Sequence, residues 1–185
     1  MRNSLSLKNK INFLPLCLLS VLLLAGISCK SPASPDETNA LYDKYKPFEG
    51  TWEGQWTNNT YGTTGNATAT VAVNTDGTVT VTIDLDGSVF GLIDPPPQTV
   101  TSTYDATGIV FEELGTAIGD IKVTMTPTSD TSGNIVVELK NTPLAGLDSI
   151  GATGTINVNT LHLDYTINFS DGSSATGVLD LTHVS

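Results

Sequence analysis

Few side chains in this sequence have the type and spacing that catalysis or metal binding requires. His162 and Asp164 lie two residues apart, so on a strand both would reach the same ion or substrate, but the pattern offers no third ligand. Glu112 and Glu113 are adjacent and would point to opposite faces of a strand, which prevents them from working as a paired acid and base. The sequence also contains no nucleophile elbow, phosphate loop, CxxC or HExxH motif. We therefore expect a protein that is not an enzyme, with no catalytic residue, no metal site and no cofactor.

The two cysteines are the reactive residues whose positions are informative. Cys17 lies inside an apolar run over residues 13–27, and Cys29 comes just after that run. The run follows a segment with three basic residues and no acidic one. A basic segment, then an apolar segment of about 7–15 residues, then small residues, is typical of a secretory signal. Cleavage before Cys29 would leave a single thiol, on the first residue of the mature chain.

A cysteine in this position resembles the bacterial lipoprotein signal, in which the chain is cut before a cysteine whose thiol carries a diacylglycerol. Ser28 fits the small residue next to the cut, while Gly26 stands where that family usually has leucine. The resemblance implies a lipoprotein signal peptide over residues 1–28 and lipidation of Cys29. Residues 29–46 are rich in Ser, Pro and acidic residues and would form a flexible tether. The alternative is a plain secretory signal, with Cys29 incidental.

A lipid anchor on Cys29 predicts where the protein is located, and the net charge of the mature chain restricts which classes of molecule it binds. The protein is expected in the bacterial cell envelope, held to the outer membrane or the cell surface by lipid. After residue 28 the chain has five lysines, no arginine and all 19 acidic residues, a net charge of −14. Nucleic acid is not expected as a partner, because phosphate backbones are bound through basic side chains. A small hydrophobic or neutral ligand is expected instead, since no guanidinium is present to hold a carboxylate or phosphate.

From residue 47 onward, apolar and polar residues alternate, which is typical of short antiparallel strands. Asp76-Gly77 and Asp171-Gly172 are hairpin turn signals. We expect an all-β domain over residues 47–185, an antiparallel up-and-down β-barrel of about 8–10 strands, with a β-sandwich as the alternative. Closure favours the barrel because it removes exposed strand edges. The strands are expected near residues 51–57, 67–73, 78–85, 89–93, 99–104, 109–113, 121–126, 135–139, 152–158 and 161–169, and in the C-terminal segment.

The start of the first expected strand carries a further pattern. Gly50-Thr51-Trp52 at the head of an antiparallel meander resembles the Gly-x-Trp signature of lipocalins and other calycins. The resemblance implies a barrel that holds a small apolar ligand, with Gly50 allowing a tight chain entry and Trp52 plugging the closed end. That family packs an arginine from a late strand on the tryptophan, and its fatty-acid-binding relatives use arginine on the ligand carboxylate. The absence of arginine after residue 28 excludes fatty-acid binding by that mechanism.

Trp56, Tyr165 and Phe169 are the candidate ligand-binding residues. Trp56 has the same parity as Trp52 and faces the same side of its strand, while Tyr165 and Phe169 share the apolar face of a later strand. Small inward residues over 67–73 leave space for a ligand in a barrel of this size. Alternatively, large inward residues from facing strands fill that space.

Two functions are compatible with these patterns. The first is a lipid-anchored cell-envelope protein that holds a small apolar or neutral ligand in its barrel. The second is a structural or surface-interaction lipoprotein with a filled barrel and no small-molecule ligand. The apolar segment 141–151 is either a loop packed over one end of the core or a rim at a ligand mouth. The sequence leaves the oligomeric state open.

Overall fold

The computed structural model describes residues 35–89, 92–93, 96–116 and 119–185. These residues form an N-terminal helix, α1, a short 3-10 helix, η1, ten long strands and a two-stranded hairpin. The helices are α1 (Pro35–Tyr45) and η1 (Lys46–Phe48), and the hairpin is β4 (Ser88–Val89) with β5 (Leu92–Ile93). The long strands are β1 (Gly50–Asn58), β2 (Thr63–Val73), β3 (Thr78–Leu85), β6 (Gln98–Asp105), β7 (Gly108–Glu113), β8 (Asp120–Ser129), β9 (Ser132–Lys140), β10 (Leu147–Asn157), β11 (Thr160–Phe169) and β12 (Ser174–His183).

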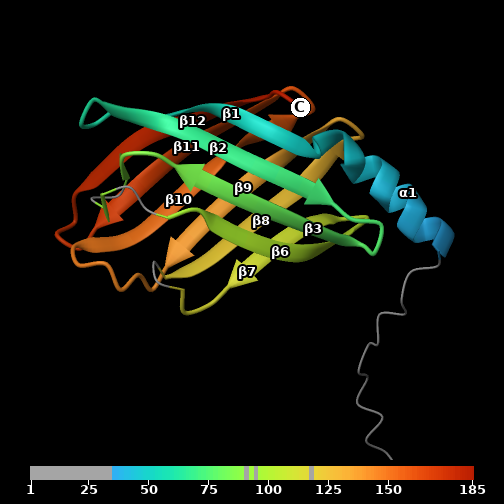
Figure 1. Cartoon of the computed structure of the whole chain (residues 1–185). Coiled ribbons are helices and arrows are strands. Elements are labelled where there is room, and N and C mark those ends of the chain that lie inside the picture. Colours follow the sequence, from blue (N-terminus) through green and yellow to red (C-terminus); the bar gives the residue numbers. More distant parts are fainter. Residues whose placement is uncertain (1–34, 90–91, 94–95, 117–118) are drawn as a thin grey trace, which may run out of the picture. The chain divides into compact units, whose positions relative to one another are not determined.

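The ten long strands form a closed antiparallel barrel (Figure 1). Each strand pairs with the next one along the chain, and β12 returns to pair with β1 from Trp52↔His183 to Asn58↔Gly177. The prediction of an up-and-down barrel is therefore confirmed, and the closure excludes the sandwich. Gly77 and Gly172 take φ values of +87° and +85° in the turns after β2 and β11, which explains why those two hairpin signals were reliable.

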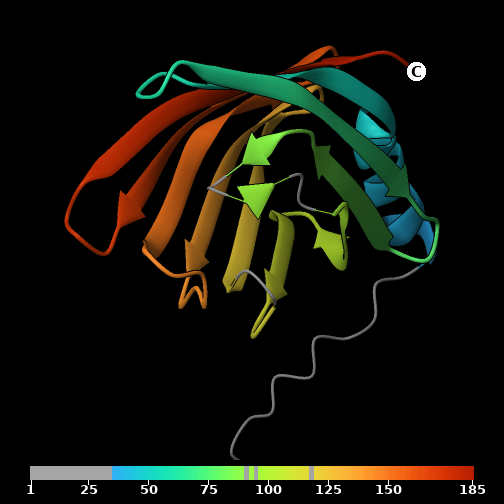
Figure 2. The same cartoon turned by 60° about the vertical axis from the view of Figure 1, so that its left-hand side comes forward.

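Alternation of the side chains places the core inside the barrel. On β2, Ala67 and Ala69 are buried while Thr68 and Thr70 are exposed, and β6 and β12 show a similar alternation. The long strands curve round a common interior (Figure 2). The buried side chains fall into two clusters. The larger cluster extends to the end of the barrel that carries α1. The smaller one lies between β8 and β12 near the other end and contains Leu139, Leu147, Ile150, Ile167 and Ala175.

Helix α1 occupies residues that the sequence analysis assigned to the flexible tether. Leu41 and Tyr42 pack against the larger core cluster, and Tyr45 is only 1% exposed. The Tyr45 hydroxyl donates a 2.7 Å hydrogen bond to the carbonyl oxygen of Asp105, in the turn between β6 and β7. Burial of these three side chains is what makes the segment helical against the barrel, since its composition alone is mostly polar. Cys29 and the expected signal peptide lie outside the described residues.

Two connections also differ from the sequence expectation. The strand expected near residues 89–93 is divided into β4 and β5, which pair with each other rather than with the barrel. Of the segment 141–151, only the first six residues form a connection, because β10 already begins at Leu147. Leu144 packs on the smaller core cluster, so this connection lies over one end of the core.

A candidate ligand cavity inside the barrel

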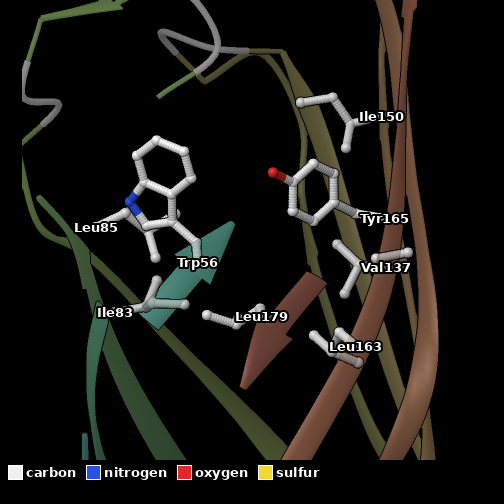
Figure 3. A pocket seen from close by; sticks show the side chains of 9 residues that line it. Trp56, Ile83, Leu85, Val137, Ile150, Leu163, Tyr165 and Leu179 are labelled. Atoms are coloured by element: carbon white, nitrogen blue, oxygen red, sulfur yellow. The ribbon is translucent and has the colours of Figure 1, made fainter. Parts of the chain in front are cut away.

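An apolar cavity of about 160 Å³ lies inside the barrel. Its lining comes from β1, β3, β9, β10, β11 and β12, so strands far apart in sequence all contribute (Figure 3). Trp56 and Tyr165 flank the cavity, and aliphatic side chains complete it (Figure 3). The described lining residues are Trp56, Ile83, Leu85, Val137, Ile150, Ala152, Leu163, Tyr165 and Leu179.

Trp56 lies flat against the barrel wall because its neighbour on β2 is a glycine. Trp56 pairs with Gly65 across the β1–β2 ladder, and a Cβ atom at Gly65 would come within 2.5 Å of the indole Nε1. The indole N–H continues across β2 and donates a 2.8 Å hydrogen bond to the carbonyl oxygen of Asp86, just after β3. The indole ring thus lies over Gly65 of β2.

Tyr165 repeats this arrangement two strands away. It pairs with Gly177 across the β11–β12 ladder, and a Cβ atom at Gly177 would come within 2.3 Å of the tyrosine ring. The hydroxyl extends across β12 and donates a 3.0 Å hydrogen bond to the carbonyl oxygen of Thr57 on β1. Burial raises the pKa of Tyr165, so the side chain is neutral at physiological pH. We call Trp56 and Tyr165 together the aromatic band.

The chemistry of the cavity is that of an apolar container. None of the described lining side chains is charged, and the two with polar atoms, Trp56 and Tyr165, each donate a hydrogen bond to a backbone carbonyl. Such a lining favours an uncharged apolar molecule and penalises a charge, which would lose its hydration without gaining a partner.

Gly50 and Trp52, the signature residues, lie at the end of the barrel near η1. A Cβ atom at Gly50 would come within 1.9 Å of the carbonyl oxygen of Ser185. The close approach of the start of β1 to Ser185 therefore requires glycine at this position. Trp52 is 1% exposed, and its indole N–H donates to the carbonyl oxygen of Phe48 at 3.2 Å. The imidazole of His183 stacks on Trp52 with ring centroids 4.7 Å apart. A histidine of the last strand, β12, thus covers one face of the Trp52 indole ring.

Phe169 is not part of the cavity lining. It lies at the end of β11, where it is half-buried and packs on the smaller core cluster near its ladder partner Leu147. Among the three candidate ligand-binding residues, the fold brings Trp56 and Tyr165 to the cavity and leaves Phe169 at the barrel end.

The aliphatic part of the lining was not singled out from the sequence. The alternation of apolar and polar residues places all of these aliphatic side chains on the inward faces of their strands, so the sequence could indicate that they face the interior. What the sequence lacked was the height of each residue along the barrel axis. That height depends on how neighbouring strands pair, for example Leu163 with Leu179.

The pair His162 and Asp164 lies on the outer face of the barrel, away from the cavity. His162 Nδ1 is 2.6 Å from a carboxylate oxygen of Asp180, and its Nε2 is 3.5 Å from Asp164. The hydrogen bond with Asp180 raises the pKa of His162, and all three side chains are exposed to solvent. Within the described ranges, no group of three or more His, Cys, Asp and Glu side chains is placed to hold a metal ion. No helix in the described part of the chain is long and apolar enough to cross a membrane.

Comparison with known proteins identifies the fold and no family. No family model and no curated protein matches the chain. The crystal structure of Rv2717c from M. tuberculosis has a TM-score of 0.58 at 11% identity, covering 83% of this chain and 99% of that one. A redesigned beta barrel, b11L5F_LGL, has a TM-score of 0.36 at 14% identity, covering 77% of this chain and 96% of its own. EF1p2_mFAP2b bound to DFHBI has a TM-score of 0.40 at 12% identity, with 78% and 98% covered. The likeness to Rv2717c shows a shared barrel fold.

Proposed function

We propose that this chain is a binding protein of the bacterial cell envelope, anchored through lipid on Cys29, that holds a small uncharged apolar molecule inside its barrel. The observation that carries the binding function is the apolar cavity flanked by Trp56 and Tyr165. A polypeptide core normally packs without voids larger than a water molecule, so an empty volume of this size has a cost in stability unless a ligand fills it. The proposed activity is binding, without catalysis, cofactor or nucleic acid.

The size of the cavity supports a ligand of modest size. An engineered apolar cavity of about 150 Å³ in another protein stays dry and binds benzene or xenon, and the cavity here is about 160 Å³. Burial of apolar surface contributes roughly 25 cal/mol per Å², which is enough for weak to moderate binding of a small apolar molecule. The acidic exterior keeps the barrel soluble at the end of its anchor.

The volume also favours a second function, a barrel that is effectively filled and serves as a structural or surface-interaction module. Ligand sites for drug-sized molecules usually measure about 300–1,000 Å³, which is larger than this cavity. In that case the cavity would be a packing defect beside the aromatic band, and partners would contact the acidic exterior.

Co-purification separates the two functions. The protein is purified from a bacterial host without removal of bound molecules and is then denatured. The small molecules that are released are identified by gas chromatography and mass spectrometry. The binding function predicts an apolar compound at a fixed ratio to the protein. Ala152→Leu adds bulk to the cavity and should abolish this compound. Gly151→Ala is the matched control, because a Cβ atom there meets nothing within 4 Å. A folded wild type with nothing bound, and no uptake of added apolar compounds, would instead support the filled barrel.

A further inference from the structure

We propose that the ligand is a compact hydrocarbon ring without a hydrogen-bond acceptor, bound against the aromatic band formed by Trp56 and Tyr165. This inference rests on the proposed binding function and narrows it to one chemical class. It follows from three observations: the hydrogen bonds that Trp56 and Tyr165 donate, the way in which their rings are fixed, and the volume of the cavity.

The first step concerns hydrogen-bond donors. Trp56 and Tyr165 carry the N–H and O–H donors of the described lining, and each already donates to a backbone carbonyl, of Asp86 and Thr57 respectively. A ligand carbonyl, carboxylate or phosphate would therefore be buried without a donor. Turning the tyrosine hydroxyl toward the ligand would leave the carbonyl of Thr57 without that hydrogen bond. Both outcomes lose a part-buried hydrogen bond, so the cavity disfavours hydrogen-bond acceptors as well as charge.

The second step concerns rigidity. Each ring lies over a glycine of the neighbouring strand and is tied at its far end to the strand beyond, so the two side chains together cover the wall from β11 to β3. The hydrogen bonds fix the far ends of the two rings, and the missing side chains of Gly65 and Gly177 leave room for the rings against the wall. Fixed aromatic surfaces favour a ring-shaped ligand, because offset-stacked and edge-to-face contacts add to the burial of area.

The third step concerns shape. The cavity lies between the two core clusters, with Leu163 and Leu179 on the side of the larger one and Ile150 belonging to the smaller one. A volume of about 160 Å³ is sufficient for a single ring with small substituents and is small for an extended acyl chain. A compact ring therefore fits better than a fatty acid or a linear alkane.

Four probes of matched chemistry test these steps. Toluene is the expected binder, benzaldehyde adds one acceptor to the same ring, benzoate adds a charge, and decane replaces the ring by a chain. Binding is followed in the purified protein by the NMR shifts of the methyl groups of Ile83 and Leu163 in the cavity. The methyl groups of Val110 and Val136, which are exposed on the outer face, are the internal control. We expect toluene to shift the cavity methyl signals in a saturable way. Benzaldehyde should bind at least about ten-fold more weakly than toluene. Benzoate and decane should leave the shifts unchanged.

Three variants test the tyrosine hydroxyl and the cavity separately. Tyr165→Phe keeps the ring but removes the hydrogen bond to Thr57 that fixes it, so toluene affinity should fall while benzaldehyde remains weak. Ala152→Leu should remove the binding of toluene, and Gly151→Ala should preserve it.

The outcomes distinguish the inference from the function on which it rests. Benzaldehyde binding as tightly as toluene, with that affinity lost in Tyr165→Phe, would show that the hydroxyl serves the ligand and would overturn the inference while leaving the binding function. Decane binding as tightly as toluene would overturn the compact shape. If none of the probes shifts the cavity methyls and the purified protein carries no apolar compound, the binding function itself fails.

Discussion

At the scale of single residues, the cavity depends on two glycines as much as on two aromatic rings. Trp56 and Tyr165 have enough volume to fill the barrel centre, and the sequence alone cannot show that they do not. The rings instead lie along the wall because Gly65 and Gly177 have no side chain at the positions they cover. Pairing an aromatic residue with a glycine on the neighbouring strand protects the glycine backbone and fixes the rotamer of the ring. The empty volume is thus specified by small residues opposite large ones.

Gly177→Ala should therefore destabilise the protein and reduce the cavity. The added Cβ atom would lie 2.1 Å from the carbonyl oxygen of Thr57 and 2.3 Å from the ring of Tyr165, so the ring must move inward or the strands must separate. Overpacking of this kind typically costs about 1–3 kcal/mol. The measurement is the free energy of unfolding by chemical denaturation. Gly151→Ala is the control on β10 and should be neutral or slightly stabilising. Equal stability of the two variants would contradict the proposed role of Gly177.

Tyr45 makes the free energy of unfolding depend on pH in the alkaline range. Burial, with the nearby charge of Asp105 adding to it, raises the pKa of Tyr45 from 10.0 to about 12. Because the pKa in the folded state is the higher one, its contribution to stability is present below pH 10 and is lost as the pH rises from 10 to 12. Tyr45→Phe should lower stability at neutral pH by about 1 kcal/mol, through loss of the hydrogen bond to Asp105, and should flatten this alkaline decline. Unfolding free energies of both proteins across that range, with the phenolate absorbance, provide the check.

At the scale of elements, the barrel is closed by a seam between the first and last strands. β1 and β12 pair over seven residues, and at one end of the seam the imidazole of His183 stacks on Trp52. The Nδ1 atom of His183 is 3.0 Å from the carbonyl oxygen of Val158, which connects the seam to the turn between β10 and β11. The end of the barrel near η1 is therefore held by contacts between segments that are far apart in the sequence.

His183→Ala should weaken this seam. It removes the stacking on Trp52 and the hydrogen bond to Val158, and we expect a loss of about 1–2 kcal/mol. His162→Ala provides a matched control on the adjacent strand β11, because that histidine is exposed and its contacts with Asp164 and Asp180 are surface ion pairs worth little. The comparison of denaturation midpoints reports the difference. If the two substitutions had the same effect, the stacking would not contribute to closure.

The limits of sequence reasoning also appear at the scale of elements. Alternation found nearly all of the barrel strands and put Trp56 and Tyr165 on the inner face, because a period of two needs no knowledge of neighbours. It could not place Phe169 at the barrel end, since the height of a residue depends on strand pairing. Helix α1 was missed because Leu41, Tyr42 and Tyr45 are sparse in a polar segment and become informative only against the barrel. The stacking of His183 on Trp52 required closure of the chain on itself.

At the scale of the whole molecule, the proposed anchor and the barrel perform separate tasks. The chain after residue 28 is strongly acidic, with 19 acidic residues against five lysines, which opposes association with anionic lipid surfaces. In the proposed function, attachment to a membrane would come from acyl chains on Cys29, and each buried methylene of a chain contributes about 0.8 kcal/mol. Two or more chains are needed for stable anchoring, and a diacylglycerol supplies them.

Cys29→Ser should therefore release the protein from the membrane without changing the barrel. Serine has no thiol to carry the diacylglycerol and is close to cysteine in size, so the unfolding free energy of the barrel should be unchanged. The measurement is the distribution between membrane and soluble fractions of a bacterial host, with the intact mass of each species. Cys17→Ser is the control, because that cysteine lies within the apolar run that the proposed cleavage removes. A wild-type mass without an acyl addition, or a Cys29→Ser protein that stays with the membrane at high salt, would contradict lipid anchoring. High salt matters because it screens any electrostatic attachment and leaves the hydrophobic one, which isolates the contribution of the acyl chains.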